Sequence, residues 1–259
     1  MITFVTSTQF NFSSWQNLKL SNIEQVMNSE IITIIREIEH LQERLNANHQ
    51  IIFSKIHNIQ SSDRRLTVFT QLFGILDRAK MGFEYSHFSL NSEEIKASMF
   101  SGLTNDEFIQ RVNSFIHFIA IEMNHAYFSV IEAFLRQILR VSAKNSPQNF
   151  WELKESILKT LNLQQWAEFL RFYSYIRNTQ HNNGLFFPSD QKDVEVSYKG
   201  KIFPFICAQK IEFLNPDLRL ILVSDGNSFV YDVCTSEKII ALPYIPDPSH
   251  FEYTPISEV

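Results

Sequence analysis

The chain has 259 residues, a formal net charge of −5 and a hydrophobic fraction of 44%. That length allows one large domain or two small ones, and that hydrophobic fraction is enough for a sizeable core. The net negative charge excludes a strongly basic protein that coats nucleic acid, but it leaves room for a local basic cleft. Only 6 residues are glycine, which disfavours a Gly-rich nucleotide-binding architecture and suits long helices.

The two cysteines, Cys207 and Cys234, do not form a CxxC pair, which predicts a reducing compartment and unreactive thiols. No apolar run is long enough to span a bilayer. Residues 1–16 have no basic segment before an apolar one, so they do not resemble a signal peptide. The sequence therefore predicts a cytoplasmic protein without membrane contact.

The first part of the chain is predicted to be helical after an irregular lead-in at residues 1–17. Ser21 and Glu24 match a capping box, and apolar residues then recur at helical spacing over 21–60, with a possible bend at 46–49. A second helix is predicted after residues 61–63, loosened at Gly82 and 86–91, and a short one over 92–100. A capping box at Thr104 and Glu107 begins a helix that continues to about 143. Two more helices are predicted, a short one that starts near 150 and another over 163–182.

After Pro188 the pattern changes to β-branched and aromatic stretches with turn signals between them. Strands are predicted at 194–198, 201–206, 218–223 and 229–233, with turns at 199–200 and 225–227 and an irregular end from Pro243. The expected fold is mostly α, a helical bundle with an N-terminal helical extension and a small C-terminal antiparallel β-sheet. We expect three regions: N-terminal helices at 1–100, the bundle at 101–190 and a β-rich tail at 191–259.

One short segment carries the chemical information, Arg177-Asn-Thr-Gln-His181-Asn-Asn-Gly184. On a helix, Arg177 and His181 are four residues apart and share a face, so they can act on one small anion. The guanidinium of Arg suits a phosphate, and the imidazole of His gives or takes a proton near neutral pH. Together they suffice for RNA cleavage without a metal or other cofactor.

This segment resembles the signature of the HEPN superfamily, an Arg followed by a polar residue, usually Asn, and then a His. Arg177, Asn178 and His181 occupy those positions, and the upstream run from Tyr127 to Arg136 resembles the earlier long helix of such domains. The resemblance covers roughly residues 105–200. It departs from the family in spacing, because three residues separate Arg from His where the family has four to six.

The resemblance implies a helical bundle that forms a homodimer and cleaves RNA, often as a toxin or in phage defence. By this reading Arg177 binds phosphate, His181 is the general acid or base, Asn178 positions the substrate and Glu132 orients Arg177 or His181. Other members of the superfamily have lost catalysis, so an inactive dimerisation, protein-binding or nucleotide-binding module, with a protein partner on the N-terminal helices, is the alternative. A plain helix ending would also explain the segment, because cationic residues and Asn-Gly are common there.

Three other patterns in the sequence have both a functional and a structural explanation. Residues 136–177 contain seven Lys or Arg residues against three Glu residues, which fits either a phosphate-attracting patch or solvated helix faces. The E-x-x-H pairs Glu37–His40, Glu84–His87 and Glu122–His125 could suggest a di-iron bundle, but the motif is weak and no metal site is predicted. His117 is expected to be buried or at an interface. The aromatic residues of the helices are expected in the core, namely Tyr127, Phe128, Phe134, Phe172, Tyr173 and Tyr175.

Overall fold

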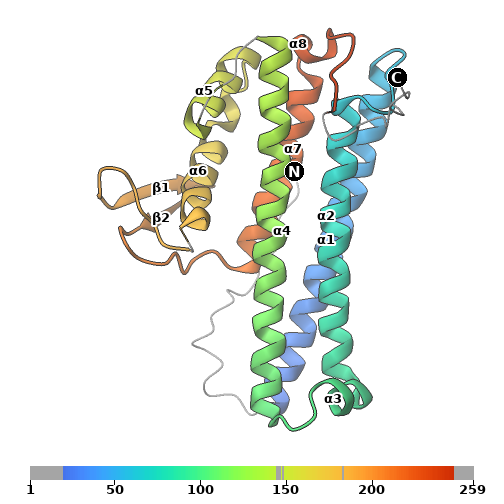
Figure 1. Ribbon diagram of the computed structural model, residues 1–259, viewed down its shortest axis with the longest axis vertical. Helices are drawn as coiled ribbons and strands as arrows, with labels where there is room; N and C mark the ends of the chain where they lie inside the picture. Colours follow the sequence, from blue (N-terminus) through green and yellow to red (C-terminus); the bar gives the residue numbers. More distant parts are fainter. Residues whose placement is uncertain (1–19, 144–146, 148, 183, 248–259) are drawn as a thin grey trace, which may run out of the picture.

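The computed structural model describes residues 20–143, 147, 149–182 and 184–247 (Figure 1). Its elements are α1 (Leu20–Lys55), α2 (Arg64–Asn91), α3 (Glu93–Met99), α4 (Asn105–Ser142), α5 (Phe150–Leu161), a 3-10 turn (Gln164–Trp166), α6 (Ala167–His181), β1 (Val194–Tyr198), β2 (Lys201–Phe205), α7 (Pro216–Thr235) and α8 (Glu237–Ile240). The predicted mostly helical fold with a small antiparallel sheet is confirmed. The predicted lead-in, the side chain of Ser21 and the end of the chain from residue 248 lie outside the described residues.

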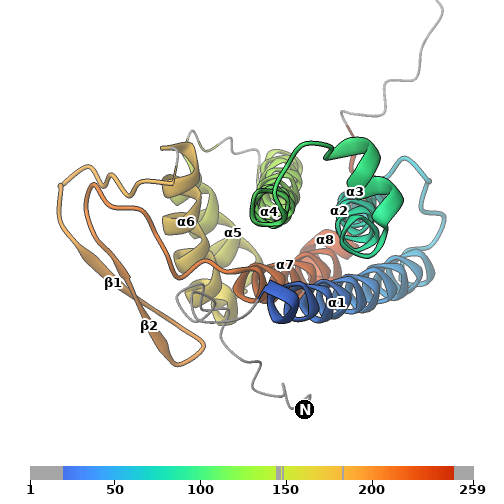
Figure 2. The same ribbon diagram turned by 90° about the horizontal axis from the view of Figure 1, so that it is seen from below.

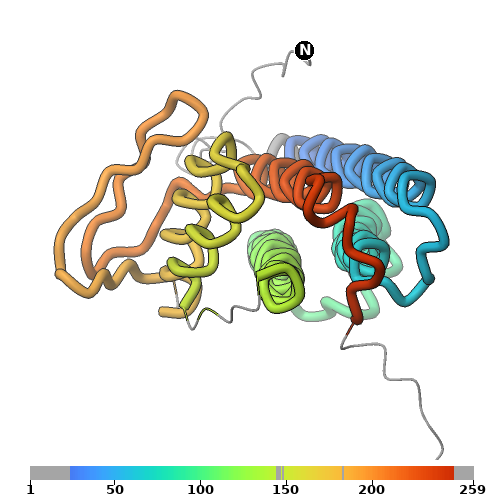
Figure 3. Tube along the Cα trace, turned by 90° about the horizontal axis from the view of Figure 1, so that it is seen from above, coloured from blue at the N-terminus to red at the C-terminus, as the bar shows by residue number. Residues whose placement is uncertain are grey.

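Four long helices form a closed ring of contacts, in which α1 packs on α2, α2 on α4, α4 on α7, and α7 on α1. Figures 2 and 3, which look along the bundle from its two ends, show this arrangement, with α5 and α6 beside α4 and α7 and the β1–β2 hairpin on the outer side of α6. One hydrophobic core runs through the bundle and continues under α6 and the hairpin. It therefore draws on residues from all three of the predicted regions.

The helix starts follow the local signals of the sequence. Thr104 and Glu107 form the predicted capping box, in which the Glu107 backbone N–H donates to the Thr104 hydroxyl at 3.3 Å and the Glu107 carboxylate accepts from the Thr104 N–H at 2.8 Å. The expected loosening of α2 at Gly82 is wrong, because α2 continues to Asn91. A Cβ at Gly82 would lie 2.7 Å from Ile119 Cδ1, so the glycine lets α2 approach α4 closely.

The prediction of four strands is only half right. β1 and β2 pair as an antiparallel hairpin with Tyr198 opposite Lys201, but the stretches at 218–223 and 229–233 are both part of helix α7. This helix packs against α1, α4, α6 and α8. The half-buried face of α7 carries most of its polar residues, Asp217, Ser224, Asp225, Ser228, Asp232 and Thr235, so the helical period is present in the sequence. The β-branched and aromatic runs on either side of Asp225-Gly226-Asn227 nevertheless resemble two strands joined by a turn. The described part of the tail is therefore a hairpin followed by two helices.

The local signals for α7 are present in the sequence. Asn215 caps the helix by accepting the Leu218 N–H at 2.9 Å, and Pro216 occupies the first helical position. The predicted turn at 225–227 is instead a point of close packing, because a Cβ at Gly226 would lie 3.0 Å from Ile131 Cδ1 on α4. A glycine in a helix interior costs about 1 kcal/mol in propensity, which the close approach of two helices can offset.

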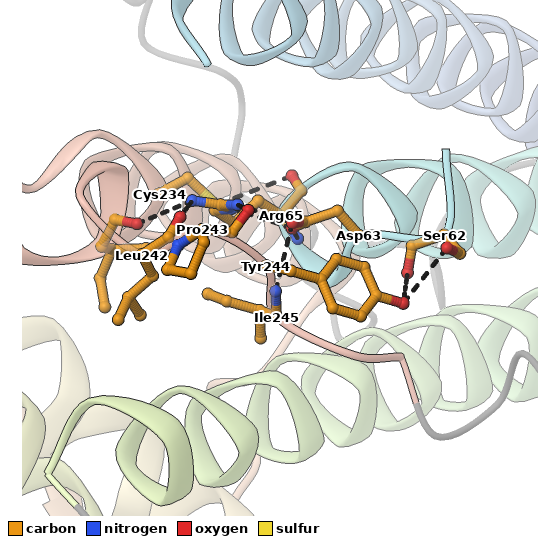
Figure 4. Close-up of polar contacts among 9 residues, drawn as sticks. Ser62, Asp63, Arg65, Cys234, Leu242, Pro243, Tyr244 and Ile245 are labelled. Carbon is orange, nitrogen blue, oxygen red and sulfur yellow. Dashed lines mark hydrogen bonds and ion pairs between the residues drawn. The ribbon is translucent and has the colours of Figure 1, made fainter. Parts of the chain in front are cut away.

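A buried ion pair holds the C-terminal segment against the start of α2 (Figure 4). Asp63 and Arg65 are both fully buried, and Arg65 Nη2 donates to Asp63 Oδ2 at 2.6 Å. Arg65 Nη1 donates to the carbonyls of Ile239 and Leu242, each at 2.8 Å, and Asp63 Oδ2 accepts the Ile245 N–H at 3.2 Å. Both charges are thus paired and hydrogen-bonded, as buried charges must be.

Cys234 is buried and Cys207 is half-buried, and neither is in a disulfide. Burial raises the pKa of the Cys234 thiol well above its ordinary value, which agrees with the prediction of an unreactive side chain there. Among the described helices, none is both long and apolar enough to cross a membrane.

Candidate functional site

A pocket of about 240 Å³ opens between α4 and α6. Its lining residues are His125, Ser129, Glu132, Ala133 and Arg136 from α4, and Tyr173, Arg177 and His181 from α6. On each helix the lining positions are three or four residues apart, which places them on one face. The volume lies below the range of roughly 300–1,000 Å³ that is typical of pockets for drug-sized ligands. The pocket therefore suits a small anion or one group of a larger molecule.

Glu132 links the two helices across the pocket. Its carboxylate accepts hydrogen bonds from Arg177 Nε at 2.8 Å and Nη2 at 3.3 Å on α6, and from Arg136 Nη2 at 2.7 Å, one turn along α4. The Glu132 side chain is only 15% exposed. The expected geometry, a Glu132 carboxylate bonded to the motif helix, is thus present, with Arg177 rather than His181 as its partner.

The charges around Glu132 leave the pocket positive. One carboxylate faces two guanidinium groups, so Glu132, Arg136 and Arg177 together carry a charge of +1 even when both imidazoles are neutral. The hydrogen bonds to Glu132 use Nε and Nη2 of Arg177, so the Nη1 edge is not part of this pair. The Arg177 guanidinium also lies 5.4 Å from the centre of the Phe150 ring, a cation–π contact that helps fix its position.

Two imidazoles lie together at the pocket, His125 from α4 and His181 from α6. Their ring centres are 6.3 Å apart, their planes are perpendicular, and both residues are exposed. Partial burial, the positive charge of Arg177 and the neighbouring His125 lower the pKa of His181 below its ordinary value, while Glu132 acts in the opposite direction. His181 is therefore mainly a neutral imidazole at pH 7, the form that can accept a proton.

The motif also ends helix α6, as the alternative interpretation expected. His181 is the last helical residue, and the Gly184 N–H donates to the Thr179 carbonyl at 2.7 Å. Gly184 has φ of +84°, a left-handed conformation that favours glycine. The helix ending and the pocket involve the same short segment, so the two interpretations of the motif are compatible.

The four residues predicted for the site do not all meet. Glu132, Arg177 and His181 line the pocket, whereas Asn178 is exposed and is not one of its lining residues. One step along a helix turns the side chain by about 100°, so Asn178 follows Arg177 onto another face. Its predicted role in positioning substrate has no support from the pocket geometry.

Sequence reasoning did not assign His125 and Arg136 to the site. Both are in α4, and the signal was their spacing, because His125, Ser129, Glu132 and Arg136 recur at helical intervals. In the sequence, His125 stands out only as half of the Glu122–His125 E-x-x-H pair. Within the described residues, no group of three or more His, Cys, Asp or Glu side chains is placed to hold a metal ion.

The remaining predictions about side chains concern the core and the basic stretch. Tyr127, Phe128, Phe134, Phe172 and Tyr173 are buried, as expected for core aromatic residues, whereas Tyr175 and His117 are half-buried. Among the basic residues, Arg136 and Arg177 line the pocket, but Lys154 is buried against the ring of Trp151, 3.4 Å from its centre. Burial lowers the pKa of Lys154 to about 8. The basic stretch is thus not one continuous phosphate-attracting surface.

Comparison of the chain with protein-family models, with curated proteins and with solved structures finds no match in any of the three.

Proposed function

We propose that this protein is a HEPN-like, metal-independent RNA endonuclease whose active site is the pocket between α4 and α6. The observation that carries the proposal is the Glu132–Arg177 pair beside His181 in one positive, solvent-open pocket. Paired charges alone would also suit a purely structural contact. An exposed histidine on the same rim, with a pKa below its ordinary value, adds a group suited to proton transfer.

The proposed reaction is an attack of the ribose 2′-hydroxyl on the adjacent phosphorus. A new bond forms between the 2′-oxygen and phosphorus, the bond to the 5′-oxygen breaks, and the products are a 2′,3′-cyclic phosphate and a 5′-hydroxyl. Arg177 stabilises the negative charge that builds on the phosphate, and Glu132 holds the guanidinium in place. His181 in its neutral form accepts the proton of the 2′-hydroxyl, and the 5′-oxygen takes up a proton as it leaves.

We further propose that the protein works as a homodimer, in a toxin–antitoxin or phage-defence system, as the resemblance implies. The α4 face next to the pocket supports a protein contact, because Phe115, Phe118 and Ile121 expose 39%, 57% and 41% of their surface. Apolar side chains that gather on one helix face are typical of interaction sites. His125 is one turn further along the same helix, so a partner there would lie near the pocket.

The test is RNA cleavage by the full chain in the presence of EDTA, compared with His181→Ala and Arg177→Ala. We expect cleavage by the wild type and a loss of about 100-fold or more in each variant. His40→Ala is the control, because His40 is on α1 with a side chain that is 69% exposed. Wild-type protein that leaves RNA intact, or variants that cleave it as fast, would refute the proposal.

A non-catalytic interaction module is the second candidate, and a specific observation favours it. Exposed apolar residues are also present on two other helices, Met81 and Phe88 on α2 and Phe53 on α1, which are 61%, 59% and 54% exposed. Under this function the His181→Ala variant keeps its partner, and a charged residue at Phe88 abolishes binding. Under the nuclease function, His181→Ala abolishes cleavage, and a charged residue at Phe88 leaves cleavage unchanged.

A further inference from the structure

The pocket holds two imidazoles, and the proposed function uses one of them. His125 reaches the pocket from α4 and His181 from α6, and their ring centres are 6.3 Å apart. Both side chains are exposed, so neither is buried as part of the core. His125 is not needed to end a helix either, because it lies in the middle of α4, which spans Asn105–Ser142.

The chemistry of the proposed reaction needs two proton transfers on different oxygens. The 2′-hydroxyl must lose a proton as it attacks, and the 5′-oxygen must gain one as it leaves. In an in-line displacement these oxygens lie on opposite sides of the phosphorus, so a single imidazole cannot reach both at once. Two imidazoles meet that need, because their ring centres are several ångströms apart. The guanidinium groups of the same pocket can hold the phosphate.

We propose that His125 is the second catalytic imidazole of the pocket and protonates the leaving 5′-oxygen, while His181 accepts the proton of the 2′-hydroxyl. The proposal rests on the proposed nuclease function and assigns both proton transfers to one chain. The proton taken by His181 and the proton given by His125 balance, and each imidazole returns to its starting state by exchange with water.

The charged groups around the two imidazoles fit these roles. His181 faces Arg177 on its own helix, and Glu132, Arg136 and His125 on α4. Two of these neighbours, Arg177 and His125, lower the pKa of His181, and Glu132 raises it. Two positive imidazoles side by side are unfavourable, which disfavours the doubly protonated state, in which the pocket would have no base.

The decisive experiment compares two substrates that differ only in their leaving group. The first is a ribonucleotide dimer, whose 5′-oxygen must be protonated, and the second is a ribonucleoside 3′-(4-nitrophenyl phosphate), whose leaving group departs without a proton. We expect His125→Asn to slow cleavage of the dimer about 100-fold or more and to cleave the nitrophenyl ester at near wild-type rate. His181→Asn should be slow on both substrates, because the 2′-hydroxyl needs a base in each.

A second measurement separates failure of this inference from failure of the proposed function. The imidazole signals of His125 and His181 are followed by NMR during titration with inorganic phosphate, with the two Asn variants for assignment and His40 as the internal control. We expect the signals of both pocket imidazoles to shift and that of His40 to stay. A shift of His181 alone, or a His125→Asn variant equally slow on both substrates, overturns the role of His125 and leaves the nuclease proposal standing. No shift of either imidazole, together with a wild type that cleaves neither substrate, overturns both.

Discussion

Glu132 on α4 and Arg177 on α6 are 45 positions apart in the chain and form the closest polar contact between these helices, with Glu132 Oε2 2.8 Å from Arg177 Nε. The same carboxylate holds Arg136 at 2.7 Å. Glu132 therefore balances one of two positive charges in a pocket that is proposed to bind phosphate, and it fixes the guanidinium that would make the contact.

Glu132→Ala should weaken the fold by about 1–2 kcal/mol, because it leaves two partly buried guanidinium groups without their acceptor. The variant should also bind inorganic phosphate more tightly, since a negative charge is gone, and yet cleave RNA more slowly, since Arg177 is no longer held. Urea unfolding, calorimetry and the cleavage assay measure the three effects. Glu122→Ala is the matched control, an exposed carboxylate on the same helix, and should change stability by less than about 0.5 kcal/mol.

The pH dependence of cleavage should follow the lowered pKa of His181. Because the imidazole must be neutral to accept a proton, activity should persist below pH 6.5, the ordinary pKa of the side chain, before it falls in acid. Glu132→Gln removes the one neighbour that raises this pKa, so the acidic limb should move to still lower pH. NMR titration of the His181 ring measures the same change directly, and a shift toward higher pH would contradict the assigned cause.

Arg65→Met should be among the most damaging single substitutions for stability. It leaves the Asp63 carboxylate buried without its counter-ion and removes the hydrogen bonds to the carbonyls of Ile239 and Leu242. Loss of one partner of a buried pair costs about 3–5 kcal/mol, which urea unfolding would detect. Arg171→Met, at an exposed position of α6, is the control and should lie within about 0.5 kcal/mol of wild type.

Glu30→Gln should stabilise the protein at neutral and alkaline pH. Burial, and to a lesser extent Asp217, raises the pKa of Glu30 from 4.5 to about 7 in the folded state. Between these two values the folded state binds more protons than the unfolded state, so the free energy of unfolding falls as pH rises. Since the side chain is only half-buried, we expect a gain of about 1 kcal/mol at pH 8 after allowance for solvent screening.

The measurement for Glu30 is the free energy of unfolding in urea at pH 5 and pH 8 for wild type and variant. The variant should lose less stability between the two pH values than the wild type does. Glu37→Gln, an exposed residue on the same helix α1, should leave the difference unchanged. An equal loss in wild type and Glu30→Gln would show that the buried carboxylate does not titrate in this range.

Much of the helical architecture could be predicted from local signals. Three helices are preceded by a residue whose side chain accepts a hydrogen bond from the first turn, namely Asp63, Ser92 and Thr104. Each of these capping residues is close in sequence to the periodic apolar residues of its helix. The β1–β2 hairpin was also predictable, because its residues alternate and its turn is Lys199-Gly200. In each case the deciding interactions lie within a few residues of one another.

The candidate site could be predicted only in part. The spacing of Arg177 and His181 by four residues placed them on one face of a helix, and the pocket confirms that they share it. The sequence could not show that Arg136 and His125 face the same space, because that depends on how α4 lies against α6. Helix α7 was missed for another reason, since its β-branched and aromatic runs flank an Asp-Gly-Asn turn signal that outweighed the polar residues spaced along one of its faces.

The sequence by itself determined which stretches begin as helices, where the hairpin turns and which short segment places a guanidinium and an imidazole on one helix face, because these depend on backbone capping and side-chain periodicity. Only the tertiary structure decided that residues 216–235 form a fourth bundle helix, that Glu132 pairs with Arg177, and that a second histidine shares the pocket. Those features depend on contacts between residues far apart in the chain, whose free energy appears only when the helices pack together.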